Sequence, residues 1–312
     1  MGPPPGVAAR DSADRDDPKG LLVRVGVAFQ LIVVMLLWAV CFPLITVGIA
    51  YAPHLTFAAM RGTTAGVALL LVAVALGRPP PRSIRTWGML ALVGFGATSL
   101  GFFGMFHAAE FVSPGIATVI ANTQPLLAAV PAQVFLGERL DRRGKAALTL
   151  GFAGVLLLTV PQMLEPGGQT YRIGVAYIVL AALGITFSNL LIKRLASEVD
   201  SVMAMGIQVL IGSLPLWLAA IFLERPQTTV WSLEFTTALL ALSLLGTSLA
   251  YWLWCAVLAR VELNRANAFT FLVPLFGLAI GVLWFGEQLD GPQLLGIGLT
   301  IGGVALASGR NS

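Results

Sequence analysis

Apolar stretches long enough to cross a bilayer recur along almost the whole 312-residue chain. A transmembrane helix needs about 20 mostly apolar residues. Only 11% of the residues are charged, against roughly 25% in soluble proteins, so there are too few charges to cover a water-exposed surface. The sequence therefore predicts an all-α membrane protein with ten transmembrane helices, at residues 27–49, 54–76, 86–109, 113–135, 144–160, 172–192, 201–223, 233–258, 264–285 and 290–308.

The first residues differ from the rest of the chain. Residues 1–24 are rich in Pro, Gly, Asp and Arg, and this composition predicts a disordered cytoplasmic tail. The apolar run that follows has spanning length and lacks the short core and cleavage-site pattern of a signal peptide. We expect it to be the uncleaved first helix.

The basic residues indicate how the chain is oriented. If the N-terminus is cytoplasmic, sixteen of the 19 Lys and Arg residues lie in cytoplasmic segments, and only Arg172 and Arg225 lie in outer loops. Such an excess is typical of cytoplasmic loops. The sequence thus predicts a multi-pass protein of a bacterial plasma membrane with both termini in the cytoplasm. Because the basic residues are spread over these loops, the net charge of +4 does not indicate nucleic-acid binding.

The two halves of the chain repeat each other. The stretch PLLAAVPAQVFLGERLD at 125–141 aligns with PLFGLAIGVLWFGEQLD at 274–290 after a shift of 149 residues. Five helices is an odd number, so two five-helix repeats, 25–160 and 171–308, would cross the membrane in opposite directions. Inverted repeats are typical of secondary transporters, whose substrate sites lie near the bilayer midplane.

Several motifs lead to a known family. They are LLWAVCFP at 36–43 and PHLTFAAMRG at 53–62 in the first half, with GTSLAYWLW at 246–254 and NRANAFTFLVPLFGLAIGVLWFGEQL at 264–289 in the second. Over residues 27–308 the chain resembles the drug/metabolite transporter superfamily, EamA branch, in its ten-helix form. The resemblance implies two inverted five-helix halves around a central cavity, working by alternating access.

The leading functional hypothesis is a secondary transporter that exports or exchanges a small metabolite, such as an amino acid or a related compound. There is no G-x-x-x-x-G-K-[ST] loop for ATP, and neither H-E-x-x-H nor G-x-S-x-G occurs. We therefore expect no catalytic residue, cofactor or metal site. The expected partners are the substrate, membrane lipid and a coupled proton or counter-substrate. The alternatives are a flippase of the same fold for a lipid-linked substrate, and a membrane-embedded receptor or enzyme.

Arg61 lies seven residues into the second predicted helix, about 10 Å from the membrane surface at 1.5 Å per residue, whereas the other Lys and Arg residues lie near the chain termini, in loops or at helix ends. A charge near the middle of a spanning helix costs about 2.5–3.5 kcal/mol, so such a residue usually faces a cavity or a partner. Arg61 either binds an anionic group of the substrate, such as a carboxylate, or has a structural role through Glu110 or backbone carbonyls.

His107 and Glu110 lie three residues apart and share a helix face. They are either a proton-coupling pair or an interfacial pair that orders the outer loop. Buried polar side chains in other helices either line the lumen or bond helices together. Aromatic residues either stack on the substrate or anchor the chain in lipid. The candidate substrate-binding residues are Arg61, Trp38, His107, Asn122, Asn189, Gln208, Tyr251, Trp254 and Asn267.

Overall fold

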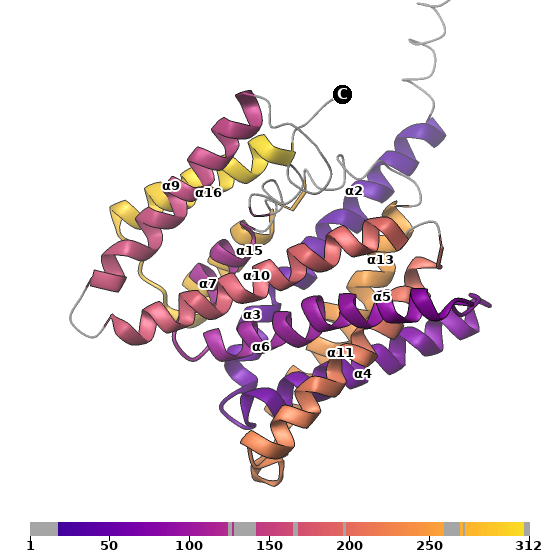
Figure 1. The fold of residues 1–312 in the computed structure, drawn as a ribbon. Coiled ribbons are helices and arrows are strands. Elements are labelled where there is room, and N and C mark those ends of the chain that lie inside the picture. The colour runs from indigo at the N-terminus through magenta and orange to yellow at the C-terminus, as the bar shows by residue number, and fades with distance from the viewer. Residues whose placement is uncertain are drawn as a thin grey trace, which may run out of the picture.

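The computed structural model describes residues 18–123, 127, 142–164, 168–195, 198–258, 269–270 and 272–308. Every regular element in these segments is helical (Figure 1). In chain order they are α2 (Pro18–Ala39), α3 (Cys41–Gly48), α4 (His54–Ala75), α5 (Ile84–Gly94), η1 (Phe95–Leu100), α6 (Gly101–Ala108), α7 (Pro114–Ala121), α9 (Arg142–Leu164), α10 (Gln169–Leu195), α11 (Ser201–Leu223), η2 (Pro226–Thr228), α12 (Leu233–Leu240), η3 (Ala241–Leu249), α13 (Ala250–Leu258), α15 (Leu272–Phe285) and α16 (Gly291–Ser308).

Seven helical segments in the described part of the chain are long and apolar enough to cross a membrane. The other three predicted spans overlap α7, α15 and α16, which are not among these seven segments. The all-helical membrane class is thus supported, and the count of ten stays a prediction. The seven are Gly26–Gly48, His54–Ala75, Ile84–Ala108, Arg142–Pro161, Gln169–Ile192, Ser201–Leu223 and Leu233–Val257.

Two prolines shape the first span. α2 begins at Pro18, inside the stretch expected to be a disordered tail, and residues 1–17 lie outside the described residues. Proline is favoured at the first position of a helix because the missing N–H has no partner there anyway. Pro43 cannot donate to the carbonyl of Ala39, and the span divides into α2 and α3 at Val40, one turn earlier.

Two long helix pairs hold the halves together at glycines. α4 packs along α11, and α9 packs along α16. A Cβ added at Gly66 would lie 2.8 Å from the backbone nitrogen of Leu210, and one added at Gly154 would lie 2.5 Å from the carbonyl oxygen of Gly296. Small residues let helix backbones approach this closely, which is the main source of attraction between helices in lipid.

The G-x-x-x-G spacing predicts close helix packing at Gly62 and Gly66, at Gly277 and Gly281, and at Gly298 and Gly302. Gly62 and Gly66 face α11, as predicted from their spacing. The prediction for Gly298 and Gly302 is wrong, because an added Cβ would meet nothing within 4 Å at either position. α16 instead turns the neighbouring Gly303 toward the backbone of α9. The spacing indicates a helix face made of small residues, but the rotation of the helix decides whether another helix packs on that face.

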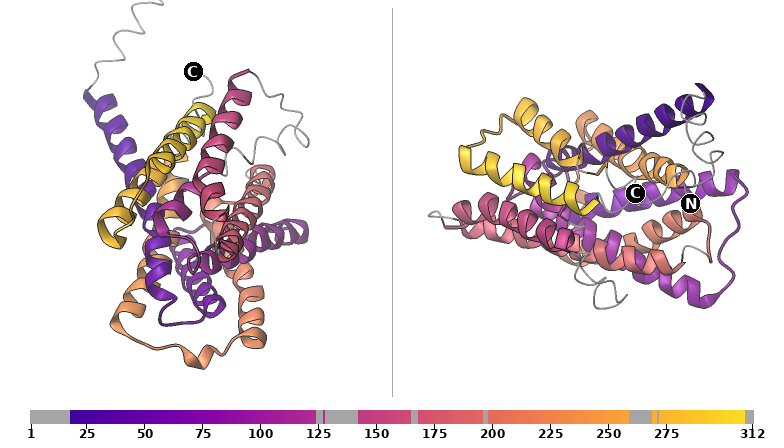
Figure 2. Two further views of the ribbon diagram at one scale, coloured as in Figure 1. Left: turned by 90° about the vertical axis from the view of Figure 1, so that its left-hand side faces the viewer. Right: turned by 90° about the horizontal axis from the view of Figure 1, so that it is seen from above.

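Two further helix contacts correspond to each other in the two halves of the chain. α2 packs on α13, and α10 packs on α6. A shift of 149 residues places α2 over α10 and α6 over α13, so each of these contacts corresponds to the other. α2 begins and α16 ends on the same side of the bundle in Figure 1 and in the left view of Figure 2. That placement is what an even number of crossings would give.

Two long helices are interrupted by wide turns at matching places. η1 follows α5 and η3 follows α12, and both are π-helical segments, which close hydrogen bonds to the fifth residue back. Shifted by 149 residues, Thr98 and Ser99 of η1 coincide with Thr247 and Ser248 of η3. All four side chains are buried. Both segments therefore present hydroxyl groups to the interior of the bundle.

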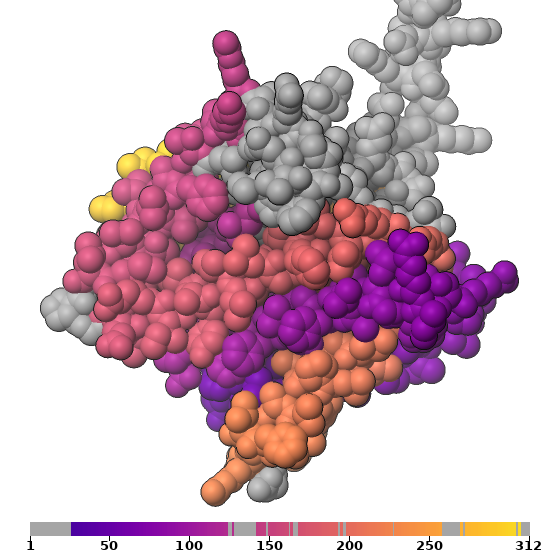
Figure 3. Space-filling view, viewed as in Figure 1, coloured from indigo at the N-terminus to yellow at the C-terminus, as the bar shows by residue number. Residues whose placement is uncertain are grey.

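The outside of the bundle is apolar. In the space-filling view, α9, α10, α5 and α11 supply much of one face (Figure 3). Large side chains such as Leu183 and Phe222 are 48% and 77% exposed. An apolar surface of this extent is stable against lipid and unfavourable against water.

Candidate functional site

Arg61 is buried in the middle of the bundle. α4 starts directly after Pro53 and carries Arg61 two turns inward, where its side chain is only 4% exposed. Its Nε donates to the hydroxyl oxygen of Thr247 at 3.3 Å, and one Nη lies 3.6 Å from the sulfur of Cys41. The guanidinium carbon lies 4.3 Å from the ring centre of Phe102. The other terminal nitrogen, Nη1, has no hydrogen-bond partner.

These partners leave the charge of Arg61 uncompensated. A hydroxyl, a thiol and an aromatic face are neutral, and a cation–π contact contributes about 0.5–2 kcal/mol. Removing an ion from water costs several kcal/mol unless an opposite charge is close. In the described part of the chain, the ion pairs are His54–Glu110 and Arg78–Asp200, and neither involves Arg61. Arg61 is therefore a buried cation without an ion pair in the described part of the chain.

The interpretation that Glu110 neutralises Arg61 is therefore not what the structure shows. The Glu110 side chain is 56% exposed, and its carboxylate lies 3.7 Å from Nε2 of His54. The hydrogen bonds of Arg61 go to side chains of α3 and η3. Of the structural roles considered from the sequence, the ion pair is excluded by this geometry.

The π-helical segment η3 positions the partner of Arg61. The hydroxyl of Thr247 donates to the carbonyl of Leu242, five residues back, at 3.0 Å. Its oxygen lone pairs then face Arg61 and accept from Nε. The matching hydroxyl in η1, that of Thr98, donates to Oε1 of Gln208 at 3.0 Å, and Gln208 is 2% exposed. Each half thus supplies a threonine that holds a polar side chain of the other half, charged in one case and neutral in the other.

Three predicted aromatic residues form one cluster beside this site. The Trp38 ring centre lies 6.5 Å from that of Tyr251 and 5.3 Å from that of Trp254. All three side chains are partly exposed. Trp38 precedes Cys41 by three residues and Tyr251 follows Thr247 by four, so each shares a helix face with a partner of Arg61.

Other predicted residues are placed elsewhere. Asn122 ends α7 and donates from Nδ2 to the carbonyl of Thr118 at 2.8 Å. Asn189 is exposed on α10, whereas the adjacent Ser188 is buried. His107 packs on Tyr177 and on the second histidine, His54. Asn267 lies outside the described residues.

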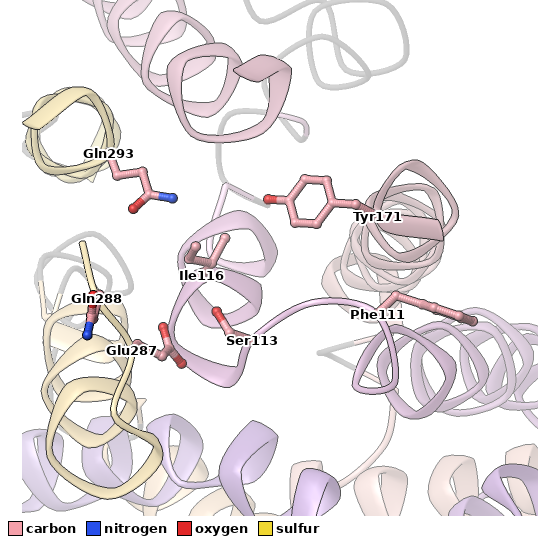
Figure 4. A pocket seen from close by; sticks show the side chains of 7 residues that line it. All are labelled: Phe111, Ser113, Ile116, Tyr171, Glu287, Gln288 and Gln293. Atoms are coloured by element: carbon pink, nitrogen blue, oxygen red, sulfur yellow. The ribbon is translucent and has the colours of Figure 1, made fainter. Parts of the chain in front are cut away.

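A separate cavity of about 280 Å³ opens near the start of α7 (Figure 4). Tyr171 and Gln293 extend into it from opposite sides, with Glu287 and Ser113 below them. Oε1 of Glu287 accepts from the backbone N–H of Gly115 at 2.7 Å. The second Glu287 oxygen and the Tyr171 hydroxyl are buried without a hydrogen-bond partner.

Sequence reasoning missed some of these groups. Cys41 and Thr247 are not among the candidate residues predicted from the sequence, although both stand in the motifs that indicate the family. The shift of 149 residues that places Thr98 over Thr247 was a usable signal, because it shows hydroxyls at the same place in both halves. Glu287 stands in the repeated motif itself, yet the motif gave no hint that the carboxylate would bind the start of α7.

The apolar spans and the polar groups buried between them define a helical membrane protein. Two segments, residues 26–160 and 172–309, match the model of the EamA-like transporter family. The chain belongs to the EamA-like transporter family, and transport rather than catalysis is the activity that this family name describes.

Relatives agree with this assignment. A probable amino-acid metabolite efflux pump of Salmonella typhimurium is 30% identical over 293 residues, covering 88% of this chain and 92% of the relative. A WAT1-related chloroplastic protein of Arabidopsis thaliana is 30% identical over 258 residues, 80% of this chain. The match spans only 62% of that relative's length. A crystal structure 20% identical in sequence superposes with a TM-score of 0.65 over 91% of this chain and 96% of its own, which shows a shared fold.

Proposed function

We propose that this transporter is a secondary carrier that exports or exchanges a small carboxylate-bearing metabolite, such as an amino acid or a related compound. The observation that carries the proposal is the buried guanidinium of Arg61, whose Nη1 has no partner. A substrate carboxylate at Nη1 would supply the missing charge and hydrogen bond. The efflux pump named above is similar over most of this chain, which supports the same substrate class.

The proposed mechanism is alternating access between two inverted five-helix repeats. Two observations support the repeats: the family model matches twice, and the α2–α13 contact corresponds to the α10–α6 contact. The basic residues support a plasma-membrane protein with cytoplasmic termini. Coupling to a proton or to a counter-substrate is part of the proposal.

Trp38, Tyr251 and Trp254 would hold the apolar part of the substrate. Their side chains are partly exposed. Trp38 and Tyr251 lie one turn from Cys41 and Thr247, the two partners of Arg61, and Trp254 packs on Trp38. Aromatic rings bury a large apolar area and keep a polar edge, which suits a substrate with both characters. Gln208 and Asn122 are further polar candidates on α11 and at the end of α7.

The test is transport by the purified protein in proteoliposomes, with and without a pH gradient. We expect unlabelled amino acids to compete with a labelled amino acid, and the corresponding decarboxylated amines not to compete. Hydrogen bonds to charged groups contribute about 1.5–3 kcal/mol, so Arg61→Gln should weaken substrate affinity by roughly 10- to 150-fold. Arg225→Gln, at an exposed loop position, is the matched control and should leave transport unchanged.

Two results would contradict the proposal. One is a folded Arg61→Gln variant that transports amino acids like the unaltered protein. The other is equal competition by amines and amino acids in the unaltered protein, a measurement that does not depend on the folding of any variant. Rates that respond to a pH gradient would indicate proton coupling, and rates that respond only to substrate on the opposite side would indicate exchange.

A further inference from the structure

The only two histidines of the chain meet in space. His54 is the first residue of α4, and His107 lies in the last turn of α6. Their rings are stacked, with centres 5.0 Å apart and planes inclined by 25°. They lie where α11 ends, because Glu224, the residue that follows α11, accepts from the backbone N–H of Leu55 beside His54.

The carboxylates of Glu224 and Glu110 lie beside the two histidines. One ligand atom each from His54, His107 and Glu224 lies within 4.8 Å of the others. Oε2 of Glu110 lies 3.7 Å from Nε2 of His54. Two ligands of a tetrahedral zinc ion, each about 2.0–2.1 Å from the metal, are about 3.3 Å apart. Small side-chain rotations would bring these groups onto one ion.

The hydrogen bonds leave the required atoms available. Nε2 of His54 is buried and has no hydrogen-bond partner. Nδ1 of His107 lies 2.8 Å from the carbonyl oxygen of Phe103, so that nitrogen carries the proton and Nε2 keeps its lone pair. Histidines that bind metals usually donate their second nitrogen to a carbonyl or carboxylate in this way.

Glu224 is held in place by the start of α4. Its two oxygens accept from the backbone N–H groups of Leu55 and Thr56, both at 2.8 Å, and from the Thr56 hydroxyl at 2.9 Å. These donors occupy some of the lone pairs of the carboxylate and leave others for a cation. A metal ligand oriented by several hydrogen bonds is typical of a formed site.

We propose that His54, His107 and Glu224, with Glu110 as a fourth ligand, form a site for a divalent transition-metal ion. Two imidazoles and carboxylate oxygens suit Zn²⁺ best among the common ions. Among the four proposed ligands only His107 and Glu110 are close in the sequence, and His54 and Glu224 come from distant segments, so no complete metal site is indicated by the sequence.

A bound ion would connect α4 and α6 of the first half with the end of α11 in the second half. His54 precedes Arg61 by seven residues on α4, about 10 Å along the helix axis. The ion would thus hold together helices that surround Arg61, and we expect Zn²⁺ to slow transport. This effect on transport rests on the proposed function, whereas metal binding itself does not.

The test uses the full chain in nanodiscs after treatment with a chelator. Zn²⁺ is titrated by calorimetry, and Co²⁺ is used as a coloured probe because a tetrahedral site gives it strong visible absorption. We expect one Zn²⁺ per chain, and at least an approximately tenfold loss of affinity in His54→Gln and in His107→Gln. Glu110→Gln, at an exposed position, should weaken binding without disturbing the fold.

Glu234→Gln is the matched control, since Glu234 is an exposed carboxylate at the start of α12, beyond the loop that follows α11. It should bind Zn²⁺ like the unaltered protein. Absence of Zn²⁺ binding in the unaltered protein would overturn the proposal. Equal binding by the two folded histidine variants would also overturn it, because the ion would then lie elsewhere. Binding without slower transport would leave the site standing and reject only its connection to the proposed function.

Discussion

Replacing Gly154 by alanine tests how closely α9 and α16 must pack. The new Cβ would lie 2.5 Å from both the carbonyl oxygen of Gly296 and the backbone nitrogen of Thr300. Ordinary contacts need at least about 3.4 Å, and backbone atoms cannot rotate away, so the two helices would have to separate by roughly 1 Å. Overpacking of this kind typically costs about 1–3 kcal/mol.

Alanine also has a higher helix propensity than glycine, by up to about 1 kcal/mol. The net loss of stability for Gly154→Ala is therefore about 1–2 kcal/mol, which lowers the thermal midpoint by about 2–6 °C in a protein of this size. Gly298→Ala is the matched control on α16, because its Cβ would meet nothing within 4 Å. It should be neutral or raise the midpoint slightly.

The assay is thermal unfolding of the purified variants in one detergent, measured under identical conditions. The reasoning would be refuted if Gly154→Ala unfolded at the same temperature as the unaltered protein. It would also be refuted if Gly298→Ala lost as much stability, because the two faces of α16 would then be equally covered.

Two further predictions concern single hydrogen bonds. Thr247→Val leaves Nε of Arg61 without an acceptor, so it should cost about 1–3 kcal/mol of stability and weaken transport. Thr237→Val, on the exposed face of α12, is the control and should change neither stability nor transport. Equal behaviour of the two variants in unfolding and transport assays would contradict this role of Thr247. Asp200 caps the start of α11, where its carboxylate accepts from the N–H groups of Val202 and Met203. Asp200→Ala should therefore lower stability by about 0.5–2 kcal/mol, and Asp200→Asn by much less. Equal losses of stability in thermal unfolding would argue against capping.

The helix positions were largely predictable from the sequence. The expected spans at 54–76 and 201–223 correspond to His54–Ala75 and Ser201–Leu223. Helix length and hydropathy are local properties, because lipid requires each crossing segment to satisfy its own backbone hydrogen bonds. The buried position of Arg61 was predictable for a related reason, since a charge within such a segment has to face the interior.

The partners of these residues were not predictable in the same way. The spacing of three residues pointed His107 toward Glu110, yet its ring stacks on His54, 53 positions earlier in the chain. Asn189 was expected inside, but the rotation of α10 buries Ser188 and exposes Asn189. Both outcomes depend on how whole helices rotate against their neighbours, which is a sum of many distant contacts and leaves no local pattern.

The wide turn of η3 also makes the number of its residues important. A turn closed five residues back contains one residue more than an α-helical turn, and one residue corresponds to about 100° of rotation. The wide turns of η3 therefore change the rotation of α13 relative to an uninterrupted α-helix, and in the observed rotation Tyr251 and Trp254 lie against Trp38. The position of the three aromatic rings beside Arg61 thus depends on the number of residues in η3. The length of this segment constrains the protein as strongly as its residue types do.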